Sequence, residues 1–78
     1  MIQLKYFGAI AEKTGSNEEE IPFLDISLKQ LIDELNQKYH LDNLSFSVAV
    51  NQKIIDKKAD YIIGKNDIIA LLPPFAGG

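Results

Sequence analysis

The sequence predicts an α+β domain in which one main helix packs across a mixed β-sheet. Residues 28–39 carry the clearest apolar stripe at helical spacing in the chain. Short stretches of alternating or continuous apolar residues lie before and after that helix, as expected for strands. At 78 residues the chain has room for one small core, so the helix should cover one face of the sheet.

Two strands and a short helix are predicted ahead of the main helix. Residues 2–7 begin with the apolar–polar alternation of a half-buried strand, and Gly8 ends the run. Residues 9–14 are good helix formers, and Gly15 after them is a natural residue for a helix C-terminus. Residues 18–24 form a second strand. Pro22 assigns that strand to an edge or a bulge, because proline has no N–H to donate to the ladder.

The main helix is predicted over residues 28–39. Ser27 suits the N-cap position, and Gln30 three residues later completes a capping box. Lys38 and His40 lie where cations favour a helix end. The apolar stripe consists of Leu28, Leu31, Ile32, Leu35 and Tyr39.

Two or three further strands are predicted after the helix. Residues 45–50 alternate again, residues 51–53 suit a hairpin turn, and residues 54–55 continue as a short strand. Residues 64–67 are a strong turn signal before a final strand over residues 68–72. Alternation along this strand places Ile69 and Leu71 on one face, and Ile68, Ala70 and Leu72 on the other.

This order of elements gives a ubiquitin-like β-grasp fold if the first and last strands pair in parallel at the centre of the sheet. We expect a β-grasp domain over residues 1–72 and an extended C-terminal tail over residues 73–78. The last strand is a continuous apolar run. Such a run is typical of a central strand covered on both faces, or of one that keeps a face for a partner.

Composition disfavours several classes of function. The net charge is −3 and all 8 basic residues are lysines, so arginine, the usual residue for bidentate phosphate and base contacts, is absent. Nucleic acid is therefore an unfavourable partner, and proteins with basic surfaces are favourable ones. The absence of cysteine excludes disulfides and thiolate sites. The sequence shows neither a signal-peptide pattern nor a membrane-spanning apolar stretch, so we expect a cytoplasmic protein with no membrane partner.

The side chains form no evident catalytic or metal-binding pattern. Residues 18–20 are three consecutive glutamates, which we interpret as a solvated strand end; a metal or basic-partner site is the alternative. His40 is the only histidine and has no neighbours at ligand spacing, so no metal site is predicted. The serines have no evident histidine partner, and the phosphate-binding glycine motifs are absent. The sequence thus predicts a scaffold without side-chain chemistry of its own.

The final residues, LLPPFAGG, are the unusual part of the sequence. They are either a frayed end or the working part. Pro73 and Pro74 give a stiff, extended exit from an apolar strand, and Phe75 can pack on a partner. Gly77 and Gly78 carry no side chain, which suits insertion into a narrow channel. The chemical group delivered would be the α-carboxylate of Gly78, which becomes an acyl donor once ATP converts it to an acyl-adenylate.

Three motifs carry a family resemblance. They are Leu72-Pro73-Pro74-Phe75-Ala76-Gly77-Gly78, the turn Gly64-Lys65-Asn66-Asp67, and Val50-Asn51-Gln52. With these motifs, its length, its element order and an opening strand that ends in Phe7, the whole chain resembles the small subunit of molybdopterin synthase. Two mild departures are Phe75 at a variable position and Lys65-Asn66 in place of a more usual acidic or glycine-containing turn. Neither affects the reacting group.

The resemblance implies a sulfur carrier. An E1-like activating enzyme would adenylate Gly78 with ATP and magnesium, and a sulfur donor would convert the terminus to a thiocarboxylate. The tail would enter the large synthase subunit, which would supply the catalytic groups, and its sulfur would pass to cyclic pyranopterin monophosphate to form molybdopterin. The complex would be a heterotetramer, and this chain would itself bind no cofactor. The residues implied to occupy the channel are Pro73, Pro74, Phe75, Ala76 and Gly77.

The resemblance also implies a docking surface. Phe7, Ile54 and Leu72 match positions that form a hydrophobic surface for the activating enzyme and the synthase. The alternative is that all three belong to the core.

Three other functions remain open on the sequence. A thiamine-pathway sulfur carrier shares the fold and the Gly-Gly chemistry, although those chains tend to be shorter and to lack the Pro-Pro pair. A ubiquitin-like modifier would be conjugated through Gly78 to a lysine amine. A structural β-grasp interaction module would be indifferent to deletion of Gly77 and Gly78.

Overall fold

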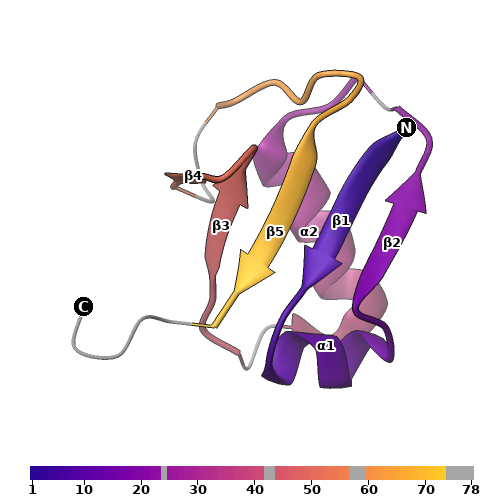
Figure 1. Ribbon diagram of the computed structural model, residues 1–78, viewed down its shortest axis with the longest axis vertical. Coiled ribbons are helices and arrows are strands. Elements are labelled where there is room, and N and C mark those ends of the chain that lie inside the picture. The colour runs from indigo at the N-terminus through magenta and orange to yellow at the C-terminus, as the bar shows by residue number, and fades with distance from the viewer. Residues whose placement is uncertain (24, 42–43, 57–59, 74–78) are drawn as a thin grey trace.

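The computed structural model describes residues 1–23, 25–41, 44–56 and 60–73. Five strands form one sheet in the order β2-β1-β5-β3-β4, and α2 crosses one face of it (Figure 1). The elements are β1 (Ile2–Tyr6), α1 (Ala9–Thr14), β2 (Glu18–Ile21), α2 (Leu28–Tyr39), β3 (Ser47–Val50), β4 (Lys53–Ile55) and β5 (Ile68–Leu72).

The centre of the sheet is the predicted parallel pair. β1 runs parallel to β5, with Gln3 opposite Ile68 and Tyr6 opposite Leu71. The remaining pairs, β1–β2, β3–β5 and β3–β4, are antiparallel. The sheet is therefore mixed, with the helix on one face, and the predicted β-grasp fold is confirmed.

The core lies between α2 and the inner face of the sheet. The predicted division of β5 is confirmed, because Ile69 and Leu71 are fully buried whereas Ile68 is exposed. Each fully buried Leu or Ile side chain contributes about 1.5–3 kcal/mol from removal of apolar surface from water. The stripe that α2 buries is Leu28, Leu31, Ile32 and Leu35.

The ends of α2 follow the prediction. The Ser27 hydroxyl accepts the backbone N–H of Gln30 at 3.2 Å, and the Gln30 side chain accepts the Ser27 N–H at 2.9 Å. This reciprocal pair is the capping box. At the other end His40 adopts the left-handed conformation, with φ 57°, and its N–H donates to the Asn36 carbonyl.

Some strand boundaries differ from the prediction. β2 ends at Ile21, because Pro22 cannot donate to the ladder; Leu24, the predicted end, lies outside the described residues. β2 lies at an edge of the sheet, as Pro22 predicted. β1 stops at Tyr6, one residue early, because Gly8 turns the chain into α1 with a positive φ. β3 begins at Ser47, two residues later than expected.

Candidate functional site

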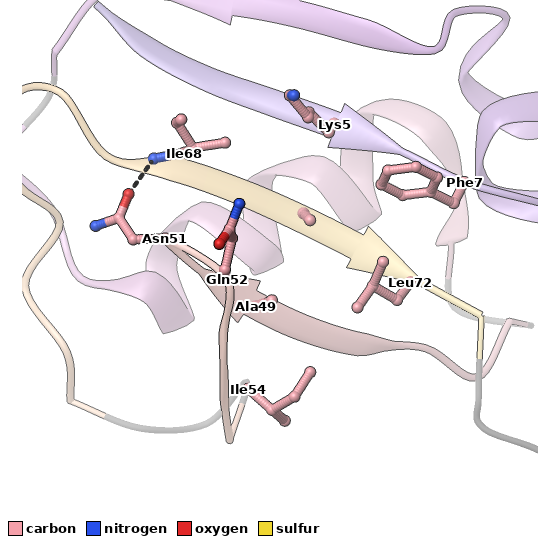
Figure 2. Close-up of a pocket in the computed structure, with 9 residues that line it drawn as sticks. Lys5, Phe7, Ala49, Asn51, Gln52, Ile54, Ile68 and Leu72 are labelled. Atoms are coloured by element: carbon pink, nitrogen blue, oxygen red, sulfur yellow. Dashed lines mark hydrogen bonds between the residues drawn. The ribbon is translucent and has the colours of Figure 1, made fainter.

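The face of the sheet opposite α2 carries a hollow of about 490 Å³ (Figure 2). It spans β1, β5, β3 and β4, and it adjoins the point where β5 ends. The residues that line the hollow are Lys5, Phe7, Ala49, Asn51, Gln52, Ile54, Ile68, Ala70 and Leu72.

Strand register explains why the face is hollowed there. Ala70 of β5 is the register partner both of Lys5 in β1 and of Ala49 in β3. Ala49 in turn pairs with Ile54 of β4. These four residues form one row across the sheet, with two alanines in the middle and long side chains at both ends. The floor of the hollow is therefore two methyl groups.

Beside the polar side chains of Lys5, Asn51 and Gln52, the rim of the hollow carries four large apolar side chains. Phe7 is 43% exposed, Ile54 53% and Ile68 39%, and Leu72 is half-buried. An exposed apolar cluster of this kind marks an interaction site more often than a scattered single residue does. The three residues that the sequence nominated, Phe7, Ile54 and Leu72, thus lie together on one face rather than in the core.

Sequence reasoning did not assign Ile68, Ala49 and Ala70 to this surface. The alternation of β5 already placed Ile68 and Ala70 on the face of Leu72, so the signal for these two was present. The contribution of Ala49 depends on the β3–β5 register, which the sequence does not reveal.

A network of hydrogen bonds lies at the end of the hollow where β5 starts, and Figure 2 shows its bond between Asn51 and Ile68. The side-chain oxygen of Asn51, Oδ1, accepts the backbone N–H of Ile68 at 3.0 Å. The side-chain nitrogen of Asn51, Nδ2, donates to Asp67 Oδ1 at 2.9 Å. The backbone N–H of Asn51 donates to the Ile68 carbonyl at 2.8 Å. Two of the motifs that carried the family resemblance, Val50-Asn51-Gln52 and the turn at residues 64–67, therefore meet through side-chain contacts.

Asp67 holds its turn through further hydrogen bonds. Its Oδ2 atom accepts the Tyr61 hydroxyl at 2.6 Å and the Gly64 N–H at 2.7 Å. Burial by itself raises the pKa of Asp67, but the hydrogen bonds from Tyr61, Gly64 and Asn51 outweigh it and lower the pKa of the carboxyl group overall. The bond to Asp67 raises the pKa of Tyr61. The carboxylate form of Asp67 is thus part of the folded structure.

The root of the tail, which we define as Gly8 and Pro73, lies beside the hollow. Pro73 follows the last residue of β5 and is exposed. A Cβ atom built on Gly8 would lie 3.4 Å from Cγ and 3.6 Å from Cβ of Pro73, so the proline ring packs on this glycine. The other predicted tail residues, Pro74, Phe75, Ala76, Gly77 and Gly78, lie outside the described residues.

The glutamate cluster is divided by the alternation of β2. Glu18 and Glu20 are exposed, whereas Glu19 turns to the helix side and accepts the hydroxyls of Tyr6 and Tyr39 at 2.8 Å each. Lys38 Nζ lies 3.3 Å from the second carboxylate oxygen of Glu19. Burial raises the pKa of Glu19, but the hydrogen bonds from Tyr39, Tyr6 and Lys38 lower it overall. Burial and the bond to Glu19 raise the pKa of Tyr6 well above its usual range.

Within the described ranges, no three His, Cys, Asp or Glu side chains are grouped so that they could hold a metal ion. His40 serves as the C-cap of α2. Over the same part of the chain, no helix has the length and apolar character needed to cross a membrane. What the described surface offers is a hollow with exposed apolar side chains beside Pro73.

Comparison with known proteins agrees with this arrangement. The ThiS family model matches residues 4–78. A Pyrococcus furiosus protein assigned as molybdopterin converting factor subunit 1 superposes with a TM-score of 0.82 at 21% identity, covering 95% of this chain and 97% of that one. Small archaeal modifier protein 1 of Haloferax volcanii gives a TM-score of 0.77 at 20% identity, with coverages of 95% and 97%.

A third solved structure is a complex of subunits 1 and 2 of molybdopterin-converting factor from Helicobacter pylori 26695. It matches with a TM-score of 0.71 at 29% identity, covering 99% of this chain and 97% of that one. The likenesses under 25% identity bear on the fold, and the family match spans nearly the whole sequence. The chain belongs to the ThiS family of ubiquitin-like sulfur carriers.

Proposed function

We propose that this protein is the sulfur-carrying small subunit of a molybdopterin synthase, and that Gly78 is its reacting residue. The observation that supports the proposal most strongly is the apolar hollow beside the root of a tail that reads Pro-Pro-Phe-Ala-Gly-Gly. Two of the structural relatives are molybdopterin converting factor subunits, and one of them is solved together with its subunit 2.

The first step is activation of the terminal carboxylate. A carboxylate oxygen of Gly78 attacks the α-phosphorus of ATP, pyrophosphate leaves, and an acyl-adenylate forms. A sulfide equivalent from a sulfur donor then attacks the carbonyl carbon and expels AMP, which leaves a thiocarboxylate. Magnesium and ATP are bound by the E1-like activating enzyme, and this chain contributes only the acyl group.

The second step is sulfur delivery in the large subunit. The thiocarboxylate sulfur, a good nucleophile, forms a bond to an oxygen-bearing carbon of cyclic pyranopterin monophosphate, and the oxygen substituent of that carbon leaves with the bonding electron pair and takes a proton from an acid of the large subunit. Water then cleaves the bond between the Gly78 carbonyl and the sulfur, which leaves the sulfur on the pterin and restores the carboxylate. Two such rounds supply the two dithiolene sulfurs, and the acid and base groups come from the large subunit.

Geometry links these reactions to the hollow. Residues 74–78 extend at most roughly 18 Å beyond Pro73, since an extended residue spans about 3.3–3.6 Å. Any active site that receives Gly78 must therefore come close to the end of β5. Phe7 and Leu72 are apolar residues near that end of the hollow, and Ile54 and Ile68 continue its apolar lining toward the start of β5. We propose that they dock the activating enzyme and the large subunit in turn, with the latter forming a heterotetramer.

The decisive experiment is intact-mass analysis after incubation with the activating enzyme, ATP and a sulfur source. Exchange of oxygen for sulfur adds about 16 Da, a nominal mass that oxidation of a methionine also adds. Met1 is the only methionine and is 57% exposed, so the modification must be localised by fragmentation. We expect the added mass on the C-terminal peptide, and the N-terminal peptide that contains Met1 should keep its unmodified mass. Absence of that shift with enzymes that thiolate a known carrier would refute the proposal.

A second candidate is a ubiquitin-like modifier, which the likeness to small archaeal modifier protein 1 favours. In that case a lysine amine attacks the activated Gly78, and the products are isopeptide-linked proteins rather than a free thiocarboxylate. A thiamine-pathway carrier would form the thiocarboxylate but would support thiazole synthesis instead. Supplying the purified thiocarboxylate to the large subunit and the pyranopterin precursor separates these outcomes, because our proposal requires dithiolene formation.

A further inference from the structure

The root of the tail pairs an unusual glycine with the first residue after β5. Gly8 has φ 59° and ψ −134°, a backbone conformation that L side chains rarely adopt. Gly8 also links β1 to α1, and its carbonyl accepts the Glu12 N–H at 3.3 Å. Its position is therefore fixed from both sides, by the central strand and by the short helix.

Pro73 rests on the open side of this glycine. Cβ, Cγ and Cδ of its ring would lie 3.6, 3.4 and 3.9 Å from a Cβ on Gly8, so all three atoms approach the space that a side chain would fill. Pro73 follows Leu72, the last residue of the ladder, and has no N–H with which the parallel pairing to β1 could continue. Beyond the last residue of β5, the chain is held next to β1 by packing of the Pro73 ring on Gly8 rather than by backbone hydrogen bonds.

We infer that Gly8 is a positioning residue for the tail. The seat that it offers to Pro73 sets the direction in which the chain leaves the sheet, and hence the path on which Gly78 meets its reaction partner. An Ala at residue 8 would change this in two ways. Its Cβ would add a van der Waals contact to the proline ring, 3.4 Å from Cγ, and the backbone would shift to relieve the positive φ and so move the surface on which the ring packs. The kinetic part of this inference rests on the proposed function, whereas the structural part does not.

Gly15 provides a control for backbone strain without contact to the tail root, and its αL conformation, with ψ 13°, is the milder of the two for an alanine. Gly15, at the other end of α1, also has a positive φ of 78°, but a Cβ there would meet nothing within 4 Å. Gly8→Ala and Gly15→Ala therefore both carry backbone strain, and only the first touches the tail root. Any effect on the tail that is shared by both variants would come from general destabilisation.

The direction of the tail can be measured without any partner enzyme. The sequence has no cysteine, so Ala76→Cys provides one attachment point for a spin label, and relaxation enhancement of backbone amides maps where the label lies. We expect Gly8→Ala to change the pattern of broadened amides and Gly15→Ala to preserve it. Pro73→Ala, which removes the ring, should reproduce the change, and adding Gly8→Ala to it should have little further effect.

Kinetics with the activating enzyme give the second measurement. A misdirected tail should lower kcat roughly 10- to 100-fold while KM stays nearly constant, because the docking face is intact. A Gly8→Ala pattern identical to that of the natural sequence would overturn the inference, as would equal effects of Gly8→Ala and Gly15→Ala on kcat. If Gly8→Ala does not fold, Pro73→Ala alone tests the inference. An unchanged label pattern in Pro73→Ala would show that packing of the proline ring on Gly8 does not set the direction of the tail. Failure of the natural sequence to become thiolated would contradict the proposed function and leave the label experiment valid.

Discussion

The proposed role of single residues in the hollow can be tested by comparison with residues of the same type and similar exposure outside it. Ile54 and Ile62 are both exposed isoleucines, at 53% and 61%, but only Ile54 lines the hollow. Phe7 and Phe23 form a second such pair, at 43% and 37%. Each pair matches residue type and exposure, so the difference within a pair reports on location alone.

If the proposed docking surface is correct, Ile54→Lys should weaken binding to the activating enzyme roughly 10- to 100-fold, because a charge that the partner buries at the rim of the hollow loses packing and must be desolvated. Ile62→Lys should change the affinity less than about twofold. Titration calorimetry with each variant checks this, and circular dichroism confirms that both remain folded. Equal losses for the two variants would place the interface elsewhere.

Glu19 and Asp67 make stability depend on pH. Their ordinary values are 4.5 and 3.8, and the hydrogen bonds that each carboxylate accepts lower both pKa values in the folded protein, against the opposing effect of burial. The unfolded chain thus binds protons more readily than the folded one. The stabilisation is fully present above pH 4.5 and is lost as the pH falls through the lower, folded pKa values.

Glu19→Gln should therefore lower the free energy of unfolding at neutral pH and approach the natural protein in acid. Denaturant titrations at about pH 7 and about pH 3 measure the difference between the two proteins. Glu34→Gln, on the exposed face of α2, is the control and should show no such convergence. A pH-independent difference for Glu19→Gln would mean that its ionisation contributes nothing.

The sequence was sufficient to assign a single residue to the core or to the outer face where strand alternation or a motif was present. Leu72 could be placed on the outer face by counting along one strand. Phe7 and Ile54 could be chosen only by resemblance, because the core and the surface were equally compatible with their residue types. The packing of Pro73 on Gly8 joins residues that are distant in the sequence, and no local pattern encodes it.

Among the elements, the β3–β4 hairpin is held in an unusual backbone conformation. Asn51 and Gln52 have φ values of 51° and 71°, and a positive φ at both central residues is the arrangement of a type I′ turn. Asparagine tolerates this conformation, whereas glutamine is strained in it.

Gln52→Gly should therefore stabilise the protein by about 0.5–1 kcal/mol, the relief of strain being partly offset by greater freedom of the unfolded chain. An increased denaturant midpoint with an unchanged m-value would show this. Asn51→Gly is the comparison, and it should destabilise because the side-chain bonds to Asp67 and Ile68 are lost. A lower midpoint for Gln52→Gly would mean that its side chain contributes more than the strain costs.

The elements themselves were largely predictable, because period and capping are local properties. The capping box at Ser27 and Gln30 fixed the start of α2 from four consecutive residues. The end of β2 was placed too late, since Phe23 read as a strand residue although Pro22 had already removed a ladder donor.

At the scale of the whole molecule, the described core ends before Pro73. Among the described residues, Leu71 is the last member of the buried core that α2 and the inner sheet face enclose. Residues 74–78 should therefore contribute to the reaction and not to stability.

A variant ending at Pro73 should unfold within about 0.5 kcal/mol of the full sequence, since surface changes away from the core have small effects. It should bind the activating enzyme and compete with the full chain, yet accept no adenylate. Thermal unfolding and a competition assay test the two halves of this prediction. A large loss of stability would show that the tail belongs to the fold.

The parallel ladder between β1 and β5 also governs how the protein reaches its native state. It joins residues 2–6 to residues 68–72, so the middle of the sheet forms only when nearly the whole chain has been gathered. Pairings of such high contact order slow folding, because the entropy of closing the loop is lost before any contact is gained. During synthesis, β1 has no central neighbour until β5 has left the ribosome. The hollow and the tail root, both built on that ladder, therefore become available to a partner only after β5 has been made.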